Sequence, residues 1–193
     1  NLDYQKTAAA FRNLGASAFE EIYSHKKQQS LFDDFEKGTL SNEQFRDEIR
    51  KYLINKTSDE AIDSAWNAML LDVPQYRLDA IASLKSDYRI FLLSNTNKIH
   101  VTSFTNALHQ TYGSNPFEQL FEKVYYSCQI NMRKPDKEIF DFVLKENNLL
   151  PEDTLFIDDS PQHIEGARKS GITAHLLEKN VDVVDLLTNL QLK

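Results

Sequence analysis

Two adjacent carboxylates, Asp158 and Asp159, directly follow a short β-type run at residues 154–157. A helical pattern over residues 162–170 comes next and ends at Gly171. Ligands in open α/β sheets bind at the carboxyl ends of the strands, so this pair lies where a site is expected. Two carboxylates at a buried strand end repel each other, and Mg²⁺ prefers oxygen ligands of this kind. The pair therefore predicts a magnesium site, because a helix N-cap would explain only one of the two aspartates.

Polar side chains also follow two earlier strand candidates. Ser94 and Asn95 come after an apolar run at residues 89–93, and Lys134 lies in the loop after residues 124–126. In a parallel sheet these groups lie along the same edge as the two aspartates. The hydroxyl and the amide can donate hydrogen bonds to phosphate oxygens, and the ammonium supplies a point charge. We therefore predict a phosphate site at Ser94, Asn95 and Lys134, which are also the candidate catalytic residues.

Each of these residues also has a purely structural explanation. Ser94 and Asn95 could form a turn or cap ahead of the next helix, and Lys134 could be a solvated lysine. The proline after Lys134 restricts the preceding backbone and favours the site role. Arg133 stays open between the two roles. For His163 we favour a plain position on its helix over a hydrogen bond near the aspartates.

The elements that must position these residues alternate between strands and helices after residue 88. Strands are expected at residues 89–93, 124–126, 154–157 and 174–177. Helices are expected at residues 98–110, 136–146 and 162–170, so the core is α/β with a parallel sheet and right-handed crossovers. The first third has helical patterns alone, at residues 4–14, 17–25, 31–37, 41–53, from 57 onward, and 74–84. Capping-box sequences open two of these helices, at residues 41–44 and 57–60. Phe32, Phe35 and Phe45 recur at helical spacing and predict a helical core.

Composition limits the class of protein. The chain has 193 residues, a net charge of −7 and 41% hydrophobic residues, enough for a sizeable core. The acidity argues against nucleic acid as a partner, and no apolar run approaches the roughly 20 residues that cross a bilayer. The one cysteine, Cys128, allows no internal disulfide and reads as a small packed residue. This fits a reducing compartment, and we expect a cytoplasmic protein.

Three segments together resemble a known family: LLSNT at 92–96, RKP at 133–135 and FIDD at 156–159, followed by IEGA at 164–167. In order and spacing they resemble motifs II, III and IV of the haloacid dehalogenase superfamily. Residues 32–45 resemble bacterial sugar-phosphate phosphatases of the α-D-glucose-1-phosphate phosphatase type. The resemblance implies a Rossmann-like core at residues 1–14 and 76–193 with an inserted all-helical cap at residues 15–75.

The resemblance also implies an activity. It points to a Mg²⁺-dependent phosphatase that acts on a small phosphorylated metabolite, such as a sugar phosphate, through an aspartyl-phosphate. By analogy Asp159 is the direct metal ligand, and Asp158 acts through water or as a second ligand. The partner is the small phosphate ester, with no nucleic acid and no membrane, and the protein is a monomer or homodimer.

One family motif is absent from this sequence. Motif I, an Asp-x-Asp or Asp-x-Gly segment after the first core strand, supplies the nucleophile and the central strand of the sheet. Asp3 cannot replace it, because no apolar strand precedes Asp3. Without the central strand, buried backbone groups would stay unpaired at roughly 1–3 kcal/mol each, against a total stability of about 5–15 kcal/mol. We therefore expect a longer natural polypeptide, with the nucleophile upstream of Asn1.

Two other functions stay open. A haloacid dehalogenase shares the Ser-Asn and Lys motifs but needs no magnesium, and the pair of Asp158 and Asp159 counts against it. A catalytically silent binding relative follows if the nucleophile motif is truly absent.

Overall fold

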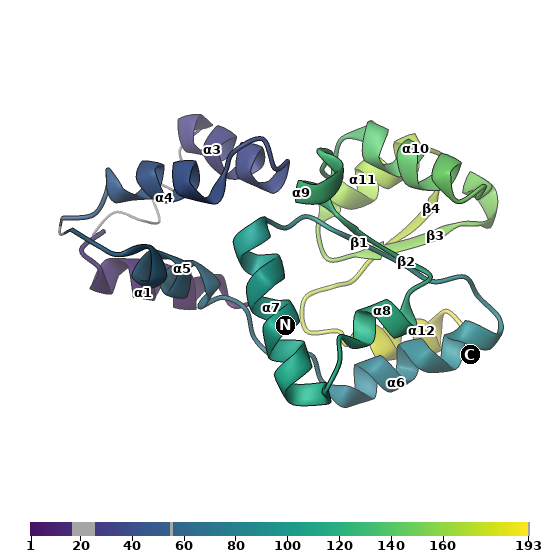
Figure 1. Ribbon diagram of the computed structural model, residues 1–193. Coiled ribbons are helices and arrows are strands. Elements are labelled where there is room, and N and C mark those ends of the chain that lie inside the picture. Colours follow the sequence, from purple (N-terminus) through teal and green to yellow (C-terminus); the bar gives the residue numbers. More distant parts are fainter. Residues whose placement is uncertain (17–25, 55, 193) are drawn as a thin grey trace. The chain divides into compact units, whose positions relative to one another are not determined.

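The computed structural model describes residues 1–16, 26–54 and 56–192 (Figure 1). Its α-helices are α1 (Tyr4–Asn13), α3 (Lys26–Glu36), α4 (Asn42–Arg50), α5 (Asp59–Asn67), α6 (Gln75–Ser83), α7 (Lys98–Tyr112), α8 (Pro116–Leu120), α9 (Ser127–Ile130), α10 (Lys137–Glu146), α11 (Pro161–Lys169) and α12 (Val183–Asn189). Its strands are β1 (Phe91–Ser94), β2 (Lys123–Tyr126), β3 (Leu155–Asp158) and β4 (Thr173–Leu176). Short 3₁₀ turns lie at η1 (Leu84–Ser86) and η2 (Pro151–Asp153).

These elements form two compact units. The first unit contains residues 1–74 and 91–131, and the second contains residues 75–90 and 132–193. The assignment of residues 15–75 to a cap, and of residues 1–14 and 76–193 to a core, stays a prediction.

The first unit contains a parallel pair of strands. β1 pairs with β2 in a register that runs from Phe91 opposite Lys123 to Ser94 opposite Tyr126 (Figure 1). The backbone beyond β1 is tied to the segment beyond β2, because the Ser127 hydroxyl accepts a bond from the Thr96 N–H and donates one to the Thr96 carbonyl, both at 2.9 Å. This tie fixes the residues that follow β1.

Helices α1, α3, α4 and α5 of the first unit share an aromatic core. Phe35 and Phe45 are 1% and 0% exposed, and their rings stack with centroids 4.0 Å apart. Phe32 stacks on Trp66 at 5.4 Å. The prediction that these phenylalanines form a helical core is confirmed.

Polar residues set the starts of two of these helices. Ser41 and Gln44 form the predicted reciprocal capping box of α4. The second box was predicted one residue too early, because Ser58 is the N-cap of α5 and its partner three residues later is Ala61, which cannot reciprocate.

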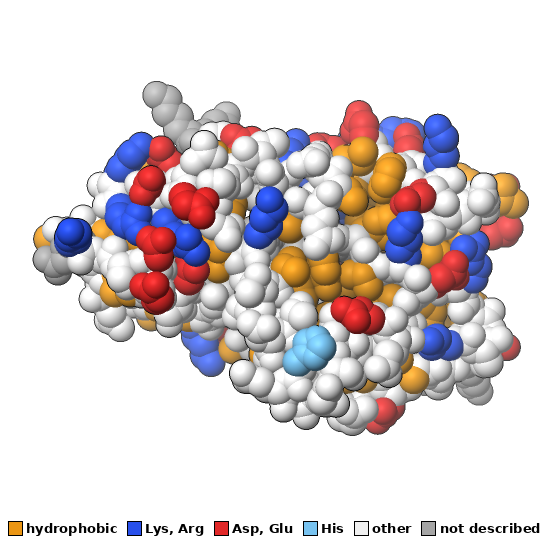
Figure 2. Space-filling model, in the orientation of Figure 1, with side chains coloured by type: hydrophobic (Ala, Val, Ile, Leu, Met, Phe, Trp, Pro, Cys, Tyr) orange, Lys and Arg blue, Asp and Glu red, His pale blue; other side chains and the backbone are white. Residues whose placement is uncertain are grey.

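Charged side chains lie on the outside of α4 and α5, where Figure 2 shows acidic and basic groups intermixed. The ion pair between Arg46 and Asp63 measures 2.7 Å, and Arg50 also pairs with Asp59. These contacts link two helices whose other faces supply Phe45 and Trp66 to the core.

The second unit contains the other parallel pair of strands. β3 pairs with β4 from Leu155 opposite Thr173 to Asp158 opposite Leu176. Helix α11 packs on both strands and against α10, while α12 packs on α6. At the surface of this unit, the Arg77 guanidinium and the Tyr76 hydroxyl both bond Asp182, the N-cap of α12.

The α/β class with parallel strands, predicted from the sequence, is confirmed. The order of strands and helices after residue 88 agrees with the prediction, and Gly171 ends α11 with a φ of 82°. Among the described residues the strands pair as β1–β2 and β3–β4 in two separate sheets. None of the described helices is both long and apolar enough to cross a membrane.

Some elements differ from the sequence prediction. Helix α3 begins at Lys26 instead of residue 31, and the short helices α8, α9 and α12 were not predicted. The helix predicted over residues 17–25 lies outside the described residues.

Candidate functional site

Three groups converge on the carboxylate of Asp158 at the end of β3. Lys134 Nζ lies 2.6 Å from Asp158 Oδ2, with side chains only 7% and 9% exposed. His163 Nδ1 lies 2.8 Å from Asp158 Oδ1, and the Ser160 N–H bonds the same oxygen at 2.9 Å. A carboxylate only accepts, so His163 carries its proton on Nδ1 in this contact. We call these four residues, together with Asp159, the carboxylate site.

The environment keeps Asp158 ionised. Burial by itself raises the pKa of this carboxyl, but the hydrogen bond from His163, the charge and hydrogen bond of Lys134 and the Ser160 N–H lower the pKa to about 2. A buried charge is tolerated where it is paired and hydrogen-bonded, and that is the situation here. The Lys134 ammonium also lies 5.4 Å from the centre of the Phe156 ring.

Close packing between α11 and the loop before α10 holds Lys134 in place. A Cβ at Gly166 would lie 2.4 Å from the Pro135 carbonyl oxygen and 2.9 Å from the Phe140 ring. Only glycine therefore allows this approach. The sequence shows why helix and loop meet, because α10 and α11 each present an apolar face that buries Ile139, Phe140 and Ile164.

Asp159 differs from its neighbour. Its side chain is exposed, and no described residue forms an ion pair or side-chain hydrogen bond with it. Asp158, by contrast, has both carboxylate oxygens occupied by donors.

The two carboxylates at the end of β3 can be compared with the ligands that Mg²⁺ takes in proteins. No group of three His, Cys, Asp or Glu residues among the described part of the chain could hold a metal. Mg²⁺, however, usually keeps several waters and takes one or two carboxylates plus substrate phosphate oxygens. Asp159, with Asp158 beside it, supplies that number of hard oxygen donors, so the residues present are compatible with the ion.

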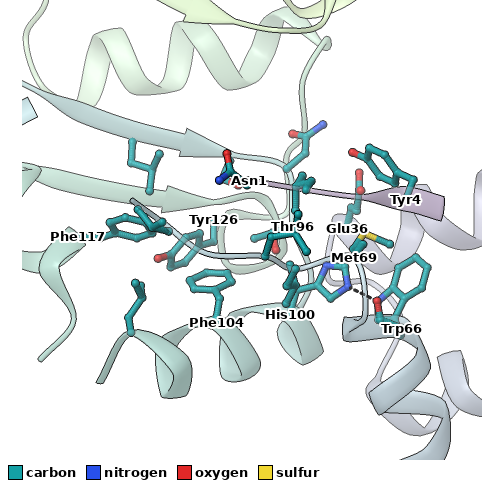
Figure 3. A pocket seen from close by; sticks show the side chains of 18 residues that line it. Asn1, Tyr4, Glu36, Trp66, Met69, Thr96, His100, Phe104, Phe117 and Tyr126 are labelled. Carbon is teal, nitrogen blue, oxygen red and sulfur yellow. Dashed lines mark hydrogen bonds between the residues drawn. The ribbon is translucent and has the colours of Figure 1, made fainter. Parts of the chain in front are cut away.

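Ser94 and Asn95 lie in the first unit, at the carboxyl end of β1. The cap of the following helix is Asn97, whose side chain accepts a bond from the His100 N–H at 3.0 Å. The structural alternative for Ser94 and Asn95, a helix cap, is therefore filled by a third residue. The two residues instead line a pocket of about 300 Å³ (Figure 3).

This pocket is largely apolar, with a smaller number of polar groups in its wall. Besides Ser94 and Asn95, polar contributions come from Asn1, Glu36, Thr96 and His100. The remaining side chains include aromatic and aliphatic groups from α5, the turn after it, α7, α8 and β2, among them Trp66, Met69, Phe104, Phe117 and Tyr126. Figure 3 shows these side chains gathered around the pocket.

A buried histidine connects two helices at the pocket wall. His100 Nε2 lies 3.2 Å from the Trp66 carbonyl oxygen, and its Nδ1 lies 3.1 Å from the Asn97 amide nitrogen. Its ring also stacks on the Trp66 indole at 5.0 Å. The neutral Nε2–H tautomer satisfies both contacts, and burial lowers the pKa of His100 to about 4.

The structure thus brings together part of the predicted site. Lys134 and Asp158 are in contact, and Ser94 and Asn95 line one pocket. The convergence of these two pairs across the units stays a prediction, as does the role of Arg133. Our preference for His163 was wrong, because it bonds Asp158 directly. The sequence signal for this contact was the position of His163, five residues after Asp158 and on the first turn of α11.

The sequence matches the model of the haloacid dehalogenase-like hydrolase family over residues 13–176. The chain belongs to this family. The predicted superfamily and the hydrolase class are therefore confirmed.

Several relatives share most of the chain. A D-ribitol-5-phosphate phosphatase from Bacteroides thetaiotaomicron is 30% identical, and the match covers 94% of this chain and 88% of the relative. A haloacid dehalogenase-family enzyme from the same organism, solved with magnesium and inorganic phosphate, is 34% identical with a TM-score of 0.85, covering 96% of this chain and 92% of that one. A HAD-like hydrolase structure from Porphyromonas gingivalis is 30% identical with a TM-score of 0.87, covering 100% and 92%.

Proposed function

We propose that this protein is a magnesium-dependent phosphatase that acts on a small phosphorylated metabolite, a sugar or polyol phosphate. The observation that carries the proposal is the buried pair of Lys134 and Asp158 beside the exposed Asp159 at the end of β3. A phosphatase among the relatives, and a relative's complex with magnesium and phosphate, support the reaction and the cofactor.

In this proposal each residue has a defined task. Asp159 holds Mg²⁺, with Asp158 as a second or water-mediated ligand, and the ion when bound neutralises charge on the phosphoryl group. Lys134 supplies a fixed positive charge for the same group, and Ser94 and Asn95 donate hydrogen bonds to its oxygens. His163 orients Asp158 through the Nδ1 contact.

The proposed reaction has two steps. An aspartate carboxylate attacks phosphorus, and the bond to the leaving oxygen breaks as that oxygen takes up a proton. Water then attacks the aspartyl-phosphate, releasing inorganic phosphate and restoring the carboxylate. The proposed cap at residues 15–75 excludes bulk water during the first step.

We further propose that the protein works in the cytoplasm, as a monomer or homodimer. The support is the single cysteine of the sequence, Cys128, which is buried in α9, and a small-molecule substrate that needs no macromolecular partner.

The experiment is hydrolysis of p-nitrophenyl phosphate by the purified protein with Mg²⁺ and then with EDTA. We expect EDTA to abolish activity. The Asp159→Asn variant should need at least about tenfold more Mg²⁺ for half-maximal rate, the scale on which metal-site changes act. Asp153→Asn, at an exposed aspartate in η2, is the matched control and should behave as wild type.

Other outcomes would favour the alternatives. Activity that survives EDTA, or a normal Mg²⁺ requirement in Asp159→Asn, would contradict the metal assignment. Chloride release from a 2-haloacid would support a dehalogenase instead. A folded protein without either activity would support a silent binding relative.

A further inference from the structure

The segment that joins β1 to α7 carries Ser94 and Asn95 and is anchored by regular structure at its two ends. Ser94 is the last residue of β1 and pairs with Tyr126 of β2. Asn97 is the N-cap of α7 and is 1% exposed. Asn95 and Thr96 lie between these points, in no helix or strand. Their positions therefore depend on contacts other than the regular hydrogen bonds of a sheet or helix.

One side chain fixes the middle of this segment. The Ser127 hydroxyl accepts a hydrogen bond from the Thr96 N–H and donates one to the Thr96 carbonyl, both at 2.9 Å. A serine hydroxyl has one proton to donate and lone pairs that accept, so these two bonds use both abilities of the group. Thr96 is 6% exposed and Ser127 is 0% exposed, so bulk water does not compete for the contact. The peptide group between Asn95 and Thr96 and the one between Thr96 and Asn97 are therefore both held by this hydroxyl.

Ser127 is itself held by the elements around it. It follows β2 and begins α9, so the pairing of β2 with β1 places it beside the segment that follows β1. A Cβ at Gly38 would lie 2.2 Å from the carbonyl oxygen of Cys128, the next residue of α9, so another stretch of backbone packs directly on this turn. The Asn131 side chain, just after α9, donates to the Lys37 carbonyl at 2.8 Å. The Ser127 hydroxyl is thus attached to a braced part of the chain.

Movement of the peptide that Ser127 holds would move a proposed phosphate donor. The carbonyl of Asn95 belongs to the same peptide group as the Thr96 N–H, so a rotation of this group turns the Asn95 backbone and carries its side chain along. Stabilisation of charge in a transition state depends on donors that are fixed in advance. A misplacement of about 1 Å can cost about a hundredfold in rate. The hydroxyl that fixes this peptide therefore bears on how the phosphoryl group is held.

We propose that Ser127 is a positioning residue for the phosphoryl group, because its hydroxyl holds Thr96 so that Ser94 and Asn95 keep the direction in which they donate. The inference rests on the proposed phosphatase function, which assigns those two donors to the phosphoryl oxygens. Ser127 contacts neither substrate nor metal in this proposal, and it acts through the Thr96 backbone. The competing explanation is that the two bonds stabilise the fold and do nothing more.

The chain contains a matched control for the loss of these bonds. The Thr7 hydroxyl donates to the Trp66 carbonyl at 3.1 Å and accepts from the Met69 N–H at 3.0 Å, and Thr7 is 2% exposed. Ser127→Ala and Thr7→Val therefore each delete one buried hydroxyl with the same kinds of backbone bond. We expect the two variants to lower the midpoint of urea unfolding by similar amounts. Effects that differ between them then come from the place of the hydroxyl and not from lost stability.

The main measurement is the Kd of inorganic phosphate in the presence of Mg²⁺, by isothermal titration calorimetry on the wild type and each variant. We expect Ser127→Ala to raise this Kd about tenfold, which corresponds to roughly one hydrogen bond to a charged group. Thr7→Val should keep it within about twofold. In hydrolysis of p-nitrophenyl phosphate, kcat/KM should fall about tenfold or more in Ser127→Ala alone.

A second variant at the same position covers the case in which Ser127→Ala does not fold. Ser127→Cys fills the space of the serine, but a thiol is a weak donor and a weak acceptor, so both bonds to Thr96 weaken. We expect Ser127→Cys to raise the Kd of phosphate at least about threefold.

The results separate this proposal from the proposed function. An unchanged Kd in folded Ser127→Ala or Ser127→Cys, or an equal rise in Thr7→Val, would overturn the positioning role and leave the phosphatase function standing. Phosphate binding by the wild type without EDTA-sensitive hydrolysis would overturn the proposed function, while the Kd values still report on Ser127. A wild type that binds no phosphate would overturn both.

Discussion

Lys134 and Asp158 form a buried pair in which each partner depends on the other. Removing one partner of a buried ion pair typically costs about 3–5 kcal/mol, because the remaining charge is uncompensated. We expect Lys134→Met to lower the free energy of unfolding by about 3 kcal/mol at pH 7, measured by urea denaturation. Lys137→Met removes an exposed pair with Asp141, 48% exposed on each side, and should cost about 0.5 kcal/mol or less.

Equal losses in the two lysine variants would contradict the view that burial makes the difference. The double variant Lys134→Met, Asp158→Asn should recover part of the loss, because it leaves no unpaired charge. Recovery is measured in the same denaturation experiment.

For individual residues, the sequence singled out Lys134 and Asp158 but did not indicate which atoms each of them contacts. Lys134 and Asp158 were predicted for different tasks, phosphate and metal, and the structure pairs them directly. Lys134 and Asp158 are 24 positions apart in the sequence. Whether their side chains meet depends on how the chain folds between them, and no local sequence pattern specifies that. His163 was missed for the same reason.

Helix α11 is the element that most directly positions the carboxylate site. Gly166 lets it approach the Pro135 carbonyl, so Gly166→Ala must push helix and loop apart. Overpacking of this kind typically costs about 1–3 kcal/mol. We expect that loss in urea denaturation, together with a lower phosphatase rate because Lys134 moves with the loop. Glu165→Ala, at the exposed neighbouring position, should change neither quantity, and equal effects of the two substitutions would contradict this account.

The elements that could be predicted from the sequence were the long ones with recognisable capping residues at their ends. The reciprocal bonds of Ser41 and Gln44, and the helix-ending glycines such as Gly171, act within a few residues, so the sequence reveals them. Helices α8, α9 and α12 have five, four and seven residues and are too short to show periodicity. Their formation depends on packing, as α8 does against β2 and α12 against α6.

The whole molecule should lose stability in acid in two stages. His100 is neutral when folded because burial lowers its pKa to about 4, while in the unfolded chain its pKa is about 6.5. Between these values the unfolded state binds the extra proton, so stability falls as pH drops from about 6.5 to about 4. The pKa values of Asp158 and Asp182 are lowered to about 2 in the folded protein. The stability that these two ionised carboxylates contribute is therefore present above about pH 4 and is lost as the pH falls toward 2.

The first stage can be isolated by substitution. His100→Gln should remove about 2 kcal/mol of the difference in unfolding free energy between pH 7 and pH 5, because glutamine takes up no proton. His109→Gln, at an exposed position of the same helix, is the control. If the two variants show the same pH dependence, His100 is not the group responsible.

The buried position of Cys128 in α9 also has a practical use. The thiol of Cys128 is buried, burial raises its pKa, and it is the one cysteine of this sequence. A buried thiol with a raised pKa reacts slowly with maleimides and similar reagents. Cysteines introduced at the surface would therefore carry fluorescent dyes almost alone, and energy transfer between two such dyes would follow the motion of the chain during turnover in an otherwise natural background.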